Sequence, residues 1–111
     1  MPADRQPEAE LDNTRFAPEH DVERHRFVVH HAGGDSVLTY QQPRADVIDL
    51  QHTVVLPAER GRGTGEALVR AALGFAREQS LRVIPTCPFV AEVLAKHPEA
   101  GKGLTMERVA R

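Results

Sequence analysis

The residues most suited to binding a ligand lie at positions 58–69, AERGRGTGEALV. Three glycines and two arginines fall within residues 60–65, and an apolar run at helical spacing follows them. The first N–H groups of a helix have no partner inside the helix, and the helix dipole adds about half a positive charge there. Glycine lets the backbone approach an anion, and arginine suits phosphate oxygens. The segment predicts either an anion site or a plain helix-capping turn.

Two familiar phosphate-binding loops do not match this spacing. A Walker A loop requires Lys-Ser or Lys-Thr after its last glycine, whereas Glu66 and Ala67 follow Gly65 here. A dinucleotide-binding loop requires Gly-x-Gly-x-x-Gly, and GRGTGE lacks the third glycine at that distance. The spacing therefore favours neither a nucleoside triphosphate nor a dinucleotide.

Cys87 is the first candidate for covalent or proton-transfer chemistry. It precedes Pro88 at a predicted strand-to-helix junction, where it would be the helix N-cap. A helix N-terminus favours a thiolate over a thiol, so this side chain is suited to act as a nucleophile or to pass a proton to a leaving group. The alternative is a small buried residue that only fills space.

His52 is the second candidate. Strict alternation along a predicted strand at 47–56 places it on the same face as the apolar residues Ile48, Leu50, Val54 and Leu56. A histidine there is either a satisfied core group or a general base, with a bulge redirecting its side chain. A neighbouring parallel strand would bring it toward Cys87, which the sequence leaves open.

The acidic residues and remaining histidines are weaker candidates. We expect Asp49 to face solvent and Glu66 to complement the helix N-terminus, although the Glu66 charge opposes a phosphate. No His or Cys pair has zinc-like spacing, and the adjacent His30 and His31 would point to opposite sides of a strand. We therefore expect no metal site.

The elements that position these residues follow from periodicity and turn chemistry. Strands are predicted at 25–31, 36–42 and 47–56, with turns AGGD and PRAD between them, which makes an antiparallel meander. A helix at 65–80, a strand at 81–85 and a helix from Pro88 to about His97 follow. The fold class is thus α/β (α+β), with helices on a mixed sheet in the order β-β-β-α-β-α. Gly74 should weaken the first helix unless it permits close packing on the sheet.

One domain fits the 111 residues. We expect a disordered tail at 1–20, the domain at 21–100 and a short mobile segment at 101–111. The net charge of −2 argues against a nucleic-acid partner, and no apolar run has the length of a membrane span. A polar start without a secretory signal and a single cysteine favour the cytoplasm.

Residues 60–65 also carry a family resemblance. RGRGTG resembles the Arg/Gln-x-x-Gly-x-Gly/Ala signature of the GNAT acetyltransferase superfamily, and it follows a strand ending in VVLP and precedes a long helix. His52-Thr53 and the segment Pro85-Thr86-Cys87-Pro88-Phe89 are similar to features of the small GNAT-like, N-acetyltransferase domain-containing proteins. The resemblance covers about residues 25–99 and implies a compact, shortened GNAT fold that binds acetyl-CoA.

The resemblance also implies roles for particular residues. Backbone N–H groups of the loop would hold the pyrophosphate, which involves Arg60, Gly61, Arg62, Gly63, Thr64, Gly65 and Glu66. The pantetheine arm would pair with a strand that splays from its neighbour, along Thr53, Val54, Val55 and Leu56. In a direct transfer, His52 or a water would be the base, and Cys87 would be the proton donor or, in a covalent variant, the nucleophile.

Two departures from the superfamily pattern bear on activity. The chain stops soon after the second helix, and the tyrosine that often protonates the leaving thiolate is missing, since the single tyrosine is Tyr40 on an early strand. The leading hypothesis is acetyl transfer from acetyl-CoA to a primary amine on a small molecule or peptide. The alternatives are a non-catalytic CoA-binding module and a protein-interaction domain that uses an exposed last strand. We expect a monomer or weak homodimer.

Overall fold

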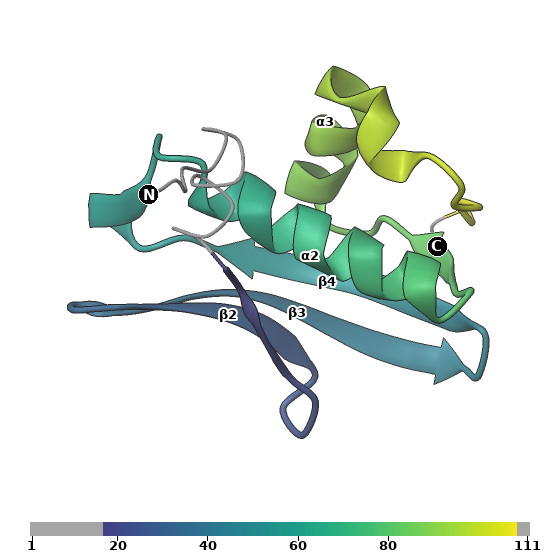
Figure 1. The fold of residues 1–111 in the computed structure, drawn as a ribbon, viewed down its shortest axis with the longest axis horizontal. Coiled ribbons are helices and arrows are strands. Elements are labelled where there is room, and N and C mark those ends of the chain that lie inside the picture. The colour runs from purple at the N-terminus through teal and green to yellow at the C-terminus, as the bar shows by residue number, and fades with distance from the viewer. Residues whose placement is uncertain (1–16, 109–111) are drawn as a thin grey trace, which may run out of the picture.

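The computed structural model describes residues 17–108, which form one mixed sheet with two helices on the same face (Figure 1). The sheet has the spatial order β1-β2-β3-β4-β5; the first four strands are antiparallel neighbours, and β5 runs parallel to β4. The predicted fold class is confirmed. The strands are β1 (Glu19–Asp21), β2 (Arg26–His31), β3 (Gly34–Arg44), β4 (Val47–Val54) and β5 (Arg82–Ile84). The helices are η1 (Pro57–Glu59), α2 (Thr64–Glu78), α3 (Pro88–Lys96) and η2 (Pro98–Gly101).

The core lies between the sheet and α2. The apolar stripe of this helix is buried, as its helical spacing requires. It packs on side chains from the facing strands, including Leu38, Ile48 and Leu50, all fully buried. Gly74 is not part of this contact, because a Cβ built on it meets nothing within 4 Å. The idea that Gly74 permits close packing on the sheet is therefore wrong.

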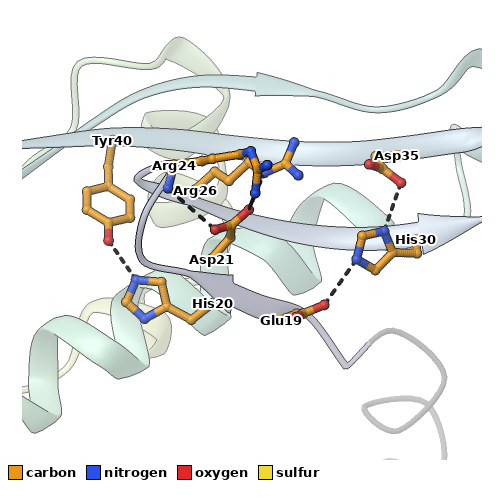
Figure 2. Close-up of polar contacts among 8 residues, drawn as sticks. All are labelled: Glu19, His20, Asp21, Arg24, Arg26, His30, Asp35 and Tyr40. Atoms are coloured by element: carbon orange, nitrogen blue, oxygen red, sulfur yellow. Dashed lines mark hydrogen bonds and ion pairs between the residues drawn. The ribbon is translucent and has the colours of Figure 1, made fainter.

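The ordered domain begins earlier than expected. Glu19–Asp21 form β1 and pair with Arg26–Val28 of β2, and the first two of these residues fall within the segment expected to be a tail. Figure 2 shows the polar contacts that hold this strand: His20 Nε2 lies 2.6 Å from the Tyr40 hydroxyl, and the Asp21 carboxylate accepts hydrogen bonds from Arg24 and Arg26. The rest of the expected tail, residues 1–16, lies outside the described part of the chain.

A β-bulge interrupts the alternation of β4. The pairing with β3 passes from Tyr40–Leu50 directly to Thr39–His52, which leaves Gln51 as an extra residue. Every side chain beyond the bulge therefore changes face relative to strict alternation. Thr53 turns toward the helices, whereas His52 and Val54 are exposed, Val54 at 56%. The prediction that His52 shares a face with Leu50 is thus wrong.

The C-terminal segment docks on β5. The Val83 N–H donates to the Thr105 carbonyl at 2.9 Å, and the Glu107 N–H donates to the Val83 carbonyl at 2.7 Å. The Glu107 carboxylate accepts from Arg44 at 2.8 Å and pairs with Arg82 at 3.1 Å. Residues 105–107, part of the segment expected to be mobile, thus pair with β5, and within residues 17–108 this strand does not present a bare edge. Residues 109–111 lie outside the described chain.

Candidate functional site

An open groove of about 580 Å³ lies between the end of β4, the loop after it and the start of α2. Of the predicted cofactor-binding residues, all but Leu56 and Arg62 line it, and Glu59 and Phe89 line it in addition. Leu56 instead packs on Gly34 and donates its N–H to the Ser36 hydroxyl, while Arg62 is exposed. The lining residues are Thr53, Val54, Val55, Glu59, Arg60, Gly61, Gly63, Thr64, Gly65, Glu66 and Phe89.

The groove borders the part of β4 from which β5 has diverged. Parallel pairing between these strands ends at Asp49–Ile84. The next link is the Cys87 N–H, which donates to the Leu50 carbonyl at 2.9 Å. Beyond it, within residues 17–108, no strand pairs with this side of β4. The backbone of Thr53 to Val55 thus borders a space that an extended ligand can occupy.

The loop presents a run of backbone donors to the groove. Gly61 and Gly63 adopt φ values of 79° and 91°, a left-handed conformation that glycine adopts without strain. The Ala67 N–H donates to the Gly63 carbonyl at 3.0 Å. Among described residues, no hydrogen bond of normal geometry engages the N–H groups of residues 61–66. This segment can therefore bind an anion through its backbone.

Thr64 adds an unpaired polar atom. Its side chain is 1% exposed and lines the groove, yet its hydroxyl has no hydrogen-bond partner among the described residues. A buried hydroxyl without a partner is unfavourable by about 1–3 kcal/mol. A phosphate oxygen close to the first turn of α2 would supply the missing partner, so this residue fits a phosphate-bearing ligand.

Gly65 serves packing rather than loop conformation. A Cβ on this residue would lie 2.8 Å from two ring atoms of Phe89 and 3.3 Å from Cγ2 of Val55. The absence of a side chain lets α2 pack closely on α3 and on Val55, the residue that follows β4, at the groove. Phe89 is not among the predicted cofactor-binding residues, although its place directly after Cys87-Pro88, in the segment 85–89 that carries the family resemblance, is a signal that it borders the site.

Cys87 and His52 are not brought together. Cys87 is the N-cap of α3, as predicted, and is 4% exposed. Its Sγ lies 3.4 Å from Oγ1 of Thr53, a groove residue, so the thiol reaches the groove through that hydroxyl. His52 follows the bulge, pairs with Thr39 and points to the opposite face of the sheet.

An ion-pair network at the rim compensates the charge of Glu66. Arg70 donates to the Glu66 carboxylate at 2.7 Å and to the Glu99 carboxylate at 3.0 Å. Those two hydrogen bonds, Glu66 first, raise the pKa of Arg70, and the bond from Arg70 lowers the pKa of Glu99. Nε2 of His97 lies 3.6 Å from the Glu66 carboxylate. The expected repulsion between Glu66 and a phosphate is therefore weakened.

Two features are absent from residues 17–108. No helix there has the length and apolar character needed to cross a membrane. No group of three or more His, Cys, Asp or Glu side chains in that range has a metal-binding arrangement.

A family profile described as GCN5-related N-acetyl-transferase matches residues 26–103, and the chain belongs to that family. Protein NATD1 of Bos taurus is 36% identical over 99 residues, which cover 87% of this chain and 88% of the relative. Protein NATD1 of Homo sapiens is 38% identical over 82 residues, covering 72% and 73%.

The fold also has a solved counterpart. The solution structure of a GCN5-like protein from Staphylococcus aureus superimposes with a TM-score of 0.61 over 78% of this chain and 85% of that one. The two sequences are 24% identical, so this similarity concerns the fold alone. The family assignment and the fold agree with the resemblance carried by residues 60–65 and 85–89.

Proposed function

We propose that this domain binds acetyl-CoA in the groove and transfers the acetyl group to a primary amine. The observation that supports the proposal most strongly concerns residues 17–108: within them, the N–H groups of residues 61–66 are not engaged, and they lie beside a strand edge that has no partner there. The pyrophosphate of CoA would accept hydrogen bonds from that run and from the Thr64 hydroxyl. The pantetheine arm would lie along Thr53 to Val55.

Arg60 gives the loop both charge and a fixed position. Its Nε donates to the Val55 carbonyl at 3.3 Å, which ties the loop to the end of β4. Because this carbonyl acceptor is neutral, it does not compensate the positive charge of the guanidinium, which can still attract a phosphate. Glu59 lies 3.9 Å from Arg62, which compensates its carboxylate at the same rim, and 3.6 Å from His31.

The chemistry requires a base for the amine and an acid for the leaving thiolate. An aliphatic amine has a pKa of about 10, so its ammonium form must lose a proton before the nitrogen attacks the thioester carbonyl. His52, exposed on the open face of the sheet, would accept that proton. When the carbon–sulfur bond breaks, the Thr53 hydroxyl would protonate the thiolate and be reprotonated by the Cys87 thiol, 3.4 Å away.

Tyr40 does not supply the acid. Its hydroxyl lies 2.6 Å from His20 at a site removed from the groove, and it is not a lining residue. This observation favours the second candidate function, a module that binds CoA or acyl-CoA without turnover. We also propose that the protein acts in the cytoplasm, because a chain with a single cysteine forms no internal disulfide, which suits a reducing compartment.

Binding followed by turnover tests the proposal. Acetyl-CoA should raise the midpoint of thermal unfolding, because a ligand that binds the folded state stabilises it. Release of free CoA with a panel of amines then separates enzyme from module. The His52→Gln variant should lower kcat while keeping acetyl-CoA affinity, and His30→Gln, which alters another exposed histidine on the same face, is the control. Binding without turnover of any amine would favour the module.

A further inference from the structure

Asp49 is a carboxylate on the open face of the sheet that the proposed chemistry does not use. Its neighbours Ile48 and Leu50 are fully buried under α2, so alternation directs Asp49 to the opposite face. The sequence suggested a freely solvated Asp49, whereas the side chain is only partly exposed in the structure. Burial of a carboxylate requires compensation by hydrogen bonds or a cation.

Neutral groups supply the hydrogen bonds. The Thr86 hydroxyl donates to Oδ1, and Nε2 of Gln51 donates to Oδ2 at 3.2 Å. Within residues 17–108, no Arg, Lys or His lies within ion-pair distance of this carboxylate, although Glu59 and Glu66 at the groove both have such partners. The two donors fix the orientation of Asp49 and leave its negative charge uncompensated.

The position of Asp49 links it to the reaction. Asp49–Ile84 is the last pair before β4 and β5 diverge, and Thr86 directly precedes Cys87. The bulge at Gln51 places His52 on the same open face as Asp49. An acceptor that approaches from this face therefore meets the proposed base and the carboxylate together.

We infer that Asp49 binds a second, non-reacting ammonium group of the acceptor, so that the acceptor is an aliphatic diamine or polyamine; this rests on the proposed acetyl transfer. The reacting nitrogen must be neutral to attack, and a carboxylate beside it would favour its protonated form. A separate ammonium group avoids that conflict. Because Gln51 is bulged out, Asp49 lies only three steps before Thr53 along the ladder with β3, about 10 Å at about 3.3 Å per step, which suits nitrogens separated by several methylenes.

Paired substrates test the inference. Putrescine and n-butylamine have the same carbon chain, and only putrescine carries a second ammonium group. The wild type should acetylate putrescine with a kcat/KM about 10- to 100-fold above that of n-butylamine, the range of a charge-assisted hydrogen bond. Asp49→Asn should remove this preference and leave n-butylamine turnover unchanged. Asp46→Asn, which removes an exposed carboxylate from the nearby turn, should keep the preference.

A binding measurement without acetyl-CoA makes the test independent of turnover. Putrescine added to the ¹⁵N-labelled protein should shift the amide signals of Asp49 and Thr86 in the wild type and in Asp46→Asn, and not in Asp49→Asn. Equal wild-type turnover of putrescine and n-butylamine, or identical putrescine shifts in Asp49→Asn, would overturn the inference alone. Failure to acetylate any amine while putrescine still shifts these signals would instead overturn the proposed function.

Discussion

Two glycines of α2 provide a controlled test of the packing around the groove. Replacing Gly65 with alanine places a Cβ 2.8 Å from the Phe89 ring and 3.3 Å from Val55, so the ring must move. Overpacking of this kind costs about 1–3 kcal/mol of unfolding free energy. Alanine is preferred over glycine inside a helix by about 1 kcal/mol, and by less in the first turn, where Gly65 lies. We expect Gly65→Ala to lower stability by about 0.5–2 kcal/mol.

Gly74→Ala is the matched control in the same helix. A Cβ there meets nothing within 4 Å, so the propensity gain is not offset. We expect an increase of about 1 kcal/mol, or about 4–8 °C in Tm for a domain of this size. Urea unfolding followed by circular dichroism measures both variants, and the two shifts should have opposite signs.

A double-mutant cycle assigns the cost to the ring. Phe89→Leu removes the two ring atoms that the new Cβ would meet, so Gly65→Ala should cost less in that background, with a coupling energy of at least about 0.5 kcal/mol. Gly74→Ala should have the same effect in both backgrounds. A Gly65→Ala protein that is more stable than the wild type, or no coupling to Phe89, would refute the account of the packing.

The remaining predictions concern β1 and the C-terminal segment. Burial lowers the pKa of His20 below its usual 6.5, so as the pH falls the unfolded chain binds a proton at this side chain before the folded protein does. The free energy of unfolding should therefore decrease as the pH drops from 6.5 through the lowered pKa. Urea titrations at stepped pH should show a flatter decrease for His20→Asn. Hydrogen bonds to Asp35 and, second, to Glu19 raise the pKa of His30. The contribution of His30 to the free energy of unfolding is therefore complete below pH 6.5 and is lost as the pH rises through the raised pKa. His30→Asn should remove that loss, and an unchanged dependence of stability on pH would count against these contacts. Truncation after residue 103 removes the strand-like pairing with Val83 and exposes the edge of β5. Size-exclusion chromatography of the truncated protein should therefore show concentration-dependent association. A monomer at all concentrations would contradict the role of this segment in covering the edge. Cys87→Ala should retain acetyl-CoA affinity, because Cys87 does not line the groove, and intact mass spectrometry of the wild type with acetyl-CoA should show no acetyl adduct on this thiol.

Local patterns were sufficient to predict β2 to β5, α2, α3 and the loop between β4 and α2. The apolar spacing of α2 and the glycines and arginines before it follow directly from periodicity and from the unpaired N–H groups of a helix start. Cys87 as the N-cap of α3 follows in the same way from Pro88 at the first helical position. These signals depend on near neighbours in the chain, which a sequence displays.

The errors arise where distant segments decide the structure. The bulge at Gln51 leaves no mark in the apolar alternation of β4, yet it reverses the facing of His52 and Thr53. Docking of the C-terminal segment depends on Glu107 reaching Arg44, 63 positions earlier. The hydrogen bond between His20 and Tyr40 likewise joins residues 20 positions apart and orders a strand within a polar segment.

Binding of CoA at the loop is the central claim, and backbone amide signals measure it most directly. Titration of CoA into the ¹⁵N-labelled protein should give saturable shifts concentrated at residues 61–66 and at Thr53 to Val55, the groove side of β4. The signals of β1 and the 105–107 segment, which lie outside the groove lining, should stay in place. No saturable shift at millimolar CoA, or shifts confined to residues outside the groove, would contradict the account.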